Sequence, residues 1–236
     1  GQQMKNILLS AFLIMGLNAN FALAEEAIAP EFMNLFQFST NEEPSVVAAI
    51  GAFAGSECRK SLPVAIRVMN EVWNGNDEAT HTVIFNFADA KSITTTFGMM
   101  SQCRAAADLF AAMSANTNPL AQQLASTVVA GGDTTKDTVY RVWQMKVSDE
   151  AAYVSAYQKL MATQAKAGLL TGAYGVMRIQ GGADENVTHF AYVGAADLES
   201  LLANSSPSKA MLSFQKKVSG IRTIYRSNIN TVLADL

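Results

Sequence analysis

Hydrophobic and polar positions follow the same order in two stretches of the chain. The stretches run over 66–92 and 174–200, 108 positions apart, and seven of their 27 aligned pairs are identical. In each stretch, two apolar runs that predict strands flank a turn rich in glycine, asparagine and aspartate, residues that tolerate positive φ. The sequence therefore predicts a strand–turn–strand unit that occurs twice.

The same kinds of element surround this unit in both halves. A strand and a capped helix precede it, and a helix and a last strand follow it. The predicted first strands are 31–39 and 139–147, and the helices after them start at 40–44 and 148–150. The second helix is 91–115 in the first half; in the second half a Ser-Ser-Pro break splits it into 198–204 and 208–218. The last strands are 124–130 and 221–232. Each half thus has the order β-α-β-β-α-β.

This order resembles the ferredoxin-like unit and, in tandem, the dimeric α/β-barrel superfamily. The resemblance covers almost the whole mature chain and depends on element order and the internal repeat. It implies an α+β fold of two ferredoxin-like β-α-β-β-α-β repeats, 25–135 and 136–236, whose sheets pack face to face as an intramolecular α/β barrel. The superfamily includes monooxygenases, haem-degrading and haem-peroxidase enzymes and isomerases, but this chain matches no catalytic motif of theirs.

Both cysteines, Cys58 and Cys103, lie in the first half. The antiparallel helices implied by the resemblance bring the end of the first helix near the start of the second, which favours a disulfide. Such a bridge would contribute roughly 3–4 kcal/mol in the chain-entropy model. Two buried free thiols are the alternative.

The first 24 residues predict a secretory signal peptide with a short remnant before it. Lys5 precedes an apolar run over 7–17, and Ala22-Leu23-Ala24 supplies small residues before a cleavage site. Eleven apolar residues are too few to cross about 30 Å of hydrocarbon, and no later stretch is long and apolar enough. We therefore expect export, to the periplasm or outside the cell, and no membrane span after cleavage.

Charge is distributed unevenly along the chain, whose net charge is −3. Residues 25–135 carry 5 basic and 12 acidic side chains, a net of −7, whereas residues 136–236 carry 11 and 8, a net of +3. A nucleic-acid partner is not expected. The asymmetry fits either packing of the two halves on each other or the scatter of solvated faces.

The chain has two histidines, and they form one of the identical pairs of the repeat. Thr80-His81 and Thr188-His189 begin the second strand of each unit, after a turn that contains acids. An imidazole beside carboxylates can transfer protons or bind a metal, and the alternative is a hydrogen-bonded surface residue. A closed metal site needs three or four ligands, so no metal is assigned.

Arginines inside predicted strands are the second set of candidates. An arginine that faces a barrel interior is costly unless it is paired or holds an anion, and aromatic rings beside it suit a small planar or acidic ligand. The alternative is that these side chains face solvent or pair with acids. Together with the histidines, they form the predicted ligand-binding set: Arg67, His81, Arg141, Trp143, Arg178 and His189.

The chain lacks the motifs of zinc proteases, common serine hydrolases and nucleotide-binding loops. Catalytic residues and cofactors are therefore left unassigned. The leading hypothesis is an exported protein that binds a small apolar or acidic ligand in a pocket between its halves. The alternatives are an enzyme of the same superfamily, monooxygenase- or haem-linked through His81 or His189, and a protein-interaction module without a small-molecule site. The sequence decides neither enzymatic activity nor oligomeric state.

Overall fold

The computed structural model describes residues 29–182, 186–203 and 207–236. These residues form the strands β1 (Phe32–Ser39), β2 (Ala65–Trp73), β3 (His81–Phe87), β4 (Asn118–Gly131), β5 (Val139–Val147), β6 (Tyr174–Gly181), β7 (His189–Ala195) and β8 (Arg222–Asp235). The helices are α1 (Glu43–Ala54), α2 (Glu57–Ser61), α3 (Ala90–Ser101), α4 (Arg104–Asn116), α5 (Glu150–Lys166), α6 (Leu198–Ala203) and α7 (Lys209–Val218). The predicted signal peptide lies outside the described residues. Within them, no helix is both long and apolar enough to cross a membrane.

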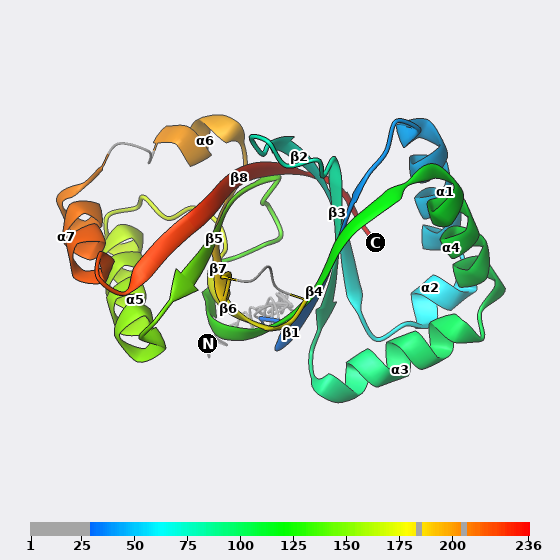
Figure 1. Ribbon diagram of the computed structural model, residues 1–236, viewed down its shortest axis with the longest axis horizontal. Coiled ribbons are helices and arrows are strands. Elements are labelled where there is room, and N and C mark those ends of the chain that lie inside the picture. Colours follow the sequence, from blue (N-terminus) through cyan, green and yellow to red (C-terminus); the bar gives the residue numbers. More distant parts are fainter. Residues whose placement is uncertain (1–28, 183–185, 204–206) are drawn as a thin grey trace, which may run out of the picture.

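All eight strands join in one closed antiparallel barrel, in the order β1-β3-β2-β8-β5-β7-β6-β4. The predicted fold class, two ferredoxin-like repeats whose sheets pack face to face as an intramolecular α/β barrel, is wrong, because the eight strands form one continuous sheet that closes on itself. The edge strands of the two halves hydrogen-bond each other, β2 with β8 and β4 with β6, because an unpaired edge would leave its N–H and C=O groups without partners. The strands of both halves thus form one ring (Figure 1), and their inner faces line a common lumen.

The internal repeat shows in the barrel as a strand order that recurs after four strands. Starting at β4, the order β4-β1-β3-β2 is followed by β8-β5-β7-β6, the corresponding strands of the second half. The strands β4 and β8 have 14 residues each because each pairs with its own half and then crosses to the other. Register shifts at these pairings let the long strands bend around the barrel.

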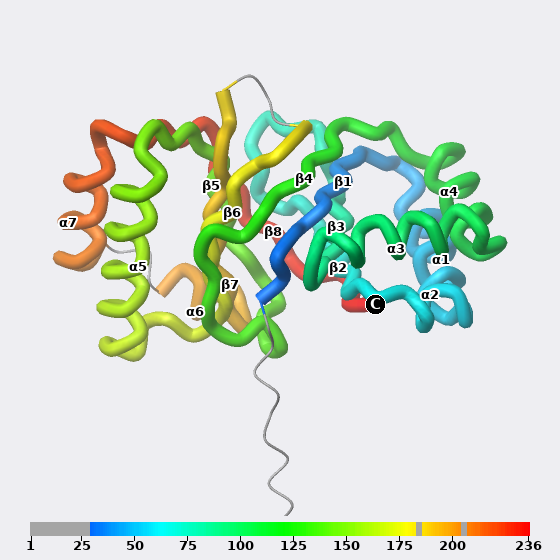
Figure 2. The backbone as a smooth tube through the Cα atoms, turned by 90° about the horizontal axis from the view of Figure 1, so that it is seen from below, coloured from blue at the N-terminus to red at the C-terminus, as the bar shows by residue number. Residues whose placement is uncertain are grey.

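The helices lie outside the barrel in two groups at opposite ends of the molecule (Figure 2). The helices α1–α4 cover the outer face of the first half, and α5 and α7 cover that of the second (Figure 1). The predicted helix 91–115 is divided into α3 and α4 at Gln102 and Cys103. A disulfide joins Cys58 of α2 to Cys103, with the Cα atoms 6.3 Å apart, and so ties α2 to the start of α4.

Candidate functional site

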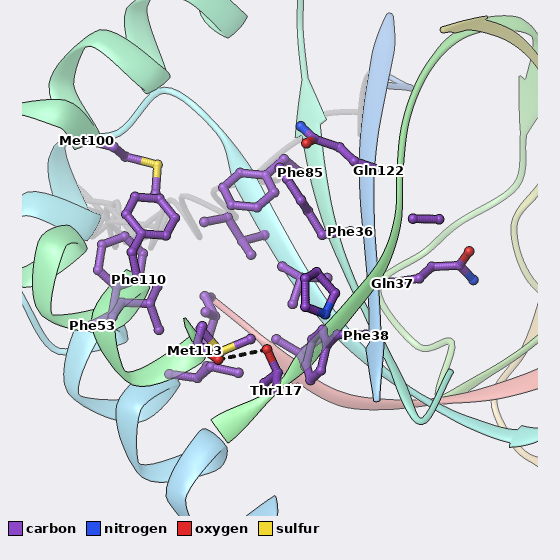
Figure 3. A pocket seen from close by; sticks show the side chains of 18 of the residues that line it. Phe36, Gln37, Phe38, Phe53, Phe85, Met100, Phe110, Met113, Thr117 and Gln122 are labelled. Carbon is purple, nitrogen blue, oxygen red and sulfur yellow. Dashed lines mark hydrogen bonds between the residues drawn. The ribbon is translucent and has the colours of Figure 1, made fainter. Parts of the chain in front are cut away.

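A cavity of about 420 Å³ lies between helices α1 and α4 and the outer face of β1–β4; we call it the helix–sheet cavity (Figure 3). Its walls carry six phenylalanines and two methionines: Phe36, Phe38, Phe53, Phe85, Phe97, Phe110, Met100 and Met113. Thr117, Gln37 and Gln122 are the polar residues among the described ones that line it, and none of these carries a charge. Aliphatic side chains from β2, β3, β4, α1 and α4 complete the lining, so the cavity is predominantly apolar, with six aromatic rings among its walls.

Side-chain periodicity explains why this cavity is apolar. Phe36 and Phe38 alternate along β1 with residues that line the lumen, so they face the helices. Ile50 and Phe53 of α1 and Met113 of α4 approach them from the other side at helical spacing. Among the lining residues, Phe110 and Leu120 are 51% and 37% exposed, which marks the side on which the cavity meets solvent.

The second half packs aromatic rings at its helix–sheet interface. Tyr153, Tyr157 and Phe214 are all buried between α5, α7 and the sheet, with the rings of Tyr157 and Phe214 6.2 Å apart. The hydroxyl of Tyr157 donates to the carbonyl oxygen of Tyr192 at 3.3 Å, which fixes that ring against the sheet. The two halves therefore differ at the interface between helices and sheet: the first half encloses the helix–sheet cavity there, and the second half packs three aromatic rings.

The barrel lumen is a second cavity, of about 770 Å³. Its apolar wall includes Met33, Leu35, Met69, Ile84, Val142 and Phe190. Polar side chains gather towards one end, where β1, β2 and β5 finish and β3 and β8 begin: Gln37, Glu71, Thr82, Gln144 and Asn228. The lumen wall is therefore mixed, with this cluster of polar side chains at one end and apolar side chains along the middle.

Glu71 is the buried acid of this polar end, only 8% exposed. The hydroxyl of Thr82 donates to one of its carboxyl oxygens, and the amide of Asn228 donates to the other at 3.2 Å. Burial raises the pKa of Glu71, although these two hydrogen bonds act in the opposite direction. A carboxyl group of this kind can exchange a proton with a bound molecule.

The other end of the lumen contains Arg67, whose charge is already paired. Its guanidinium bonds the carboxylate of Asp235 at 2.6 and 2.9 Å and also donates to the hydroxyl of Tyr140. It lies over the ring of Tyr140, 5.3 Å from the centroid. Burial raises the pKa of the neighbouring Tyr192 to about 12, so that phenol stays neutral.

The two histidines lie outside both cavities, at the starts of α1 and α5. Nδ1 of His189 is 2.8 Å from the Thr188 hydroxyl, and Nε2 is 2.8 Å from the carboxylate of Glu150, the first residue of α5. Hydrogen bonds from Arg178, with a smaller effect from His189, lower the pKa of Glu150 to about 2. This cluster attaches the start of α5 to β6 and β7.

His81 has a similar but looser environment. Its Nδ1 is 2.8 Å from the Thr80 hydroxyl, its Nε2 is 3.8 Å from a Glu43 oxygen, and its ring stacks on Phe38 at 5.3 Å. Burial lowers the pKa of His81. Phe38 separates this ring from the helix–sheet cavity, since Phe38 lines the cavity and His81 does not.

The six predicted ligand-binding residues do not surround one cavity. Arg67 lines the lumen, and Arg178 and His189 meet at Glu150. Arg141 and Trp143 alternate with lumen-lining residues, and Trp143 packs on the core of the second half. The role of this set in ligand binding remains a prediction.

Sequence reasoning did not identify Glu71 or the phenylalanine-lined cavity. The spacing of Arg67, Met69 and Glu71 within one strand was an available signal, since residues two apart share a face. The phenylalanines gave no comparable signal, because they come from β1, β3, α1, α3 and α4. Only the tertiary fold brings them together.

Comparison with solved structures shows how far this architecture is shared. A candidate monooxygenase from Fusobacterium nucleatum subsp. nucleatum is 12% identical at a TM-score of 0.60, covering 88% of this chain and 94% of its own. An anthrone oxidase-like protein is 12% identical at 0.55, covering 89% and 94%. A haem-binding protein from Thermus thermophilus is 7% identical at 0.55, covering 87% and 95%.

These similarities establish the fold. No protein-family model matches the sequence, and no curated protein sequence matches it significantly. The structural neighbours are members of the dimeric α/β-barrel superfamily, so the resemblance stated from the sequence is confirmed, whereas the packing of two separate sheets inferred from it was wrong. The chain therefore has the fold of the dimeric α/β-barrel superfamily.

Histidine is a common axial ligand of haem iron, and neither His81 nor His189 lines either cavity. Both ring nitrogens of His189 are engaged. The Nε2 atom of His81 has no hydrogen-bond partner among the described residues, but the ring is buried and stacks on Phe38. Methionine holds haem iron in proteins together with histidine, but the methionines of the helix–sheet cavity have no histidine beside them in its lining. The residues present do not fit a histidine-held haem.

Proposed function

We propose that this protein is an oxygenase-type enzyme that binds a flat, apolar aromatic substrate in the helix–sheet cavity. The observation that carries the proposal is the cavity of about 420 Å³ lined by six phenylalanines and two methionines. An apolar cavity of about 150 Å³ holds one benzene, so this space suits roughly two to three rings. Offset and edge-on ring contacts, with thioether sulfur at ring edges, favour a planar aromatic molecule there.

The structural neighbours suggest the reaction class. Two of them are described as a candidate monooxygenase and an anthrone oxidase-like protein. In a reaction of the anthrone type, a CH₂ group between two rings reacts with O₂ to give a carbonyl group and water. The two hydrogens leave with one oxygen atom, and the other oxygen stays on the carbon. The cavity walls would bind and orient the substrate and exclude water.

A binding protein without turnover is the second candidate. One observation favours it: among the described residues, the helix–sheet cavity is lined by no acidic or basic side chain, and the hydroxyl of Thr117 already donates to the carbonyl oxygen of Met113. Any oxidation there would depend on the intrinsic reactivity of the substrate towards O₂. We also propose that the protein is exported, and the disulfide between Cys58 and Cys103 supports this because disulfides persist in oxidising compartments.

Anthrone is the probe that separates these possibilities. Binding is measured by calorimetry without O₂, and turnover by O₂ uptake above the protein-free rate. Leu109→Trp places an indole in the cavity and should abolish both binding and turnover. Leu212→Trp, on the exposed surface of α7, is the matched control and should change neither.

The outcomes have distinct meanings. Anthrone binding without O₂ uptake above background would favour the binding protein over the enzyme. Binding that survives Leu109→Trp would refute the assignment of the helix–sheet cavity, as would failure of anthrone and two-ring analogues to bind at all. Circular dichroism of both variants checks that each is folded.

A further inference from the structure

The polar end of the lumen contains a buried acid without a cationic partner among the described residues. The hydrogen bonds to the Glu71 carboxyl come from neutral side chains, Thr82, Asn228 and Gln37. The charged neighbour that acts on Glu71 is another acid, Asp77, which is itself paired with Arg226. A buried carboxylate is costly without a compensating positive charge. This end of the lumen thus leaves room for a cation supplied by a ligand.

Two further acceptors lie in the lumen wall. The Oδ1 atoms of Asn228 and Asn230 are buried and have no hydrogen-bond partner in the structure. A buried acceptor left unsatisfied costs free energy, and each such group in a folded protein calls for a physical reason. Together with the carboxyl of Glu71, they make this end of the lumen rich in acceptors.

The rest of the lumen determines what else the ligand must carry. Next to the polar end, the wall includes apolar side chains such as Leu35, Met69 and Ile84. At the far end, Arg67 is held by Asp235 and Tyr140 and would have to release Asp235 to bind an acidic ligand in full. The lumen therefore favours a cationic ligand over an anionic one.

We propose that the barrel lumen is a second ligand site, which takes a small apolar molecule with a terminal primary amine whose ammonium group binds Glu71. An ammonium group has three N–H donors and no acceptor, which matches the carboxyl and the two asparagine oxygens. Its charge pairs with the carboxylate, and the body of the molecule lies along the apolar wall. Gln37, Ile66 and Leu236 line both cavities, but the proposed ammonium-binding residues Glu71, Asn228 and Asn230 line the lumen alone, and the proposal does not depend on the oxidation proposed for the helix–sheet cavity.

Calorimetric titration of the whole protein with 2-phenylethylamine tests the proposal. Two probes of similar size, 2-phenylethanol and 3-phenylpropanoate, replace the ammonium by a neutral and an anionic group. The amine should bind at least about tenfold more tightly than either, because only it can pair with a buried carboxylate. Equal affinities for the three molecules would refute the proposal, as would the absence of amine binding.

Variants locate the binding site. Glu71→Gln keeps the shape of the side chain and removes its charge, and it should weaken amine binding by about tenfold or more. Glu78→Gln, an exposed position on the turn between β2 and β3, removes the same charge outside the lumen and should have no effect. Val142→Phe adds a ring to the lumen wall and leaves Glu71 unchanged, so it tests whether the amine binds in the lumen even if Glu71→Gln is unstable.

Competition distinguishes this site from the helix–sheet cavity. Saturating anthrone should leave the affinity for 2-phenylethylamine unchanged, and Leu109→Trp should do the same. Loss of amine binding in Leu109→Trp, together with unchanged binding in Glu71→Gln, would place the amine in the helix–sheet cavity and overturn the proposal. Failure of anthrone to bind would leave the amine result intact, since the two tests use different residues.

Discussion

At the level of single residues, the repeated Thr-His pairs illustrate what a local pattern can and cannot predict. The repeat identified His81 and His189 as equivalent, and both rings do contact the preceding threonine in the same way. The carboxylates beside them, however, are Glu43 and Glu150, the first residues of α1 and α5. Those contacts depend on how a helix docks on the sheet, which spacing within the hairpin does not encode.

The Glu150 cluster predicts a specific response to acid. Its pKa is lowered to about 2, chiefly by hydrogen bonds from Arg178, from an ordinary value of 4.5. A carboxyl group with a lowered pKa stabilises the fold above pH 4.5, and this contribution disappears as the pH falls towards about 2. Glu150→Gln should therefore be less stable than the parent at neutral pH and should lose less stability on acidification.

Urea unfolding at several pH values between neutral and about 3 measures this difference. Glu199→Gln, on the exposed surface of α6, removes the same charge outside the cluster and is the control. A constant stability difference between parent and Glu150→Gln over the whole range would show that the ion pair with Arg178 does not contribute to folding.

At the level of elements, alternation and helical spacing gave the order of strands and helices correctly in outline. The start of α5 follows from a cap, Asp149, whose side chain accepts from the backbone N–H of Ala152. The length of β4 was underestimated, because half of that strand pairs with β1 and the rest with β6 of the other half. Partners so distant in sequence leave no periodic signal.

The attachment of α2 to α4 leads to a prediction about the helix–sheet cavity. The disulfide joins two cysteines that are 45 residues apart in the sequence. Removing it increases the conformational entropy of the unfolded chain, which lowers the free energy of unfolding by about 3–4 kcal/mol. A Cys58→Ser/Cys103→Ser variant should therefore lose roughly this much free energy of unfolding. Because α4 supplies Leu109, Phe110 and Met113 to the cavity, anthrone should also bind more weakly.

Urea unfolding and anthrone calorimetry of the serine variant measure both effects. The parent protein treated with a reductant is the control for the substitutions themselves, since it should show the same loss. A stability equal to that of the oxidised parent would indicate that the bond contributes no constraint in the unfolded state.

At the level of the whole molecule, the pattern of one half does not predict how the two halves join. A bare apolar face can be buried by pressing two sheets together or by enclosing a lumen, and the sequence of one half is compatible with both. Closure depends on β2 pairing with β8 and β4 with β6, contacts between strands far apart in the chain. The ion pair of Asp77 with Arg226 adds a side-chain link between the halves.

Because each half completes the hydrogen bonding of the other, we expect the barrel to unfold in one cooperative transition. Opening either the β2–β8 or the β4–β6 pairing would expose two strand edges together with the lumen wall, so neither half has a stable partner-free state.

Trp143, in a Trp73→Phe variant, reports on the second half through its packing against the core there. Phe97→Trp, in a variant without either native tryptophan, reports on the first half. Within each variant, the urea transition followed by tryptophan fluorescence should have the same midpoint and slope as the transition followed by circular dichroism. Two separated midpoints within one variant, by fluorescence and by circular dichroism, would show instead that the halves are independent folding units joined only at their edges.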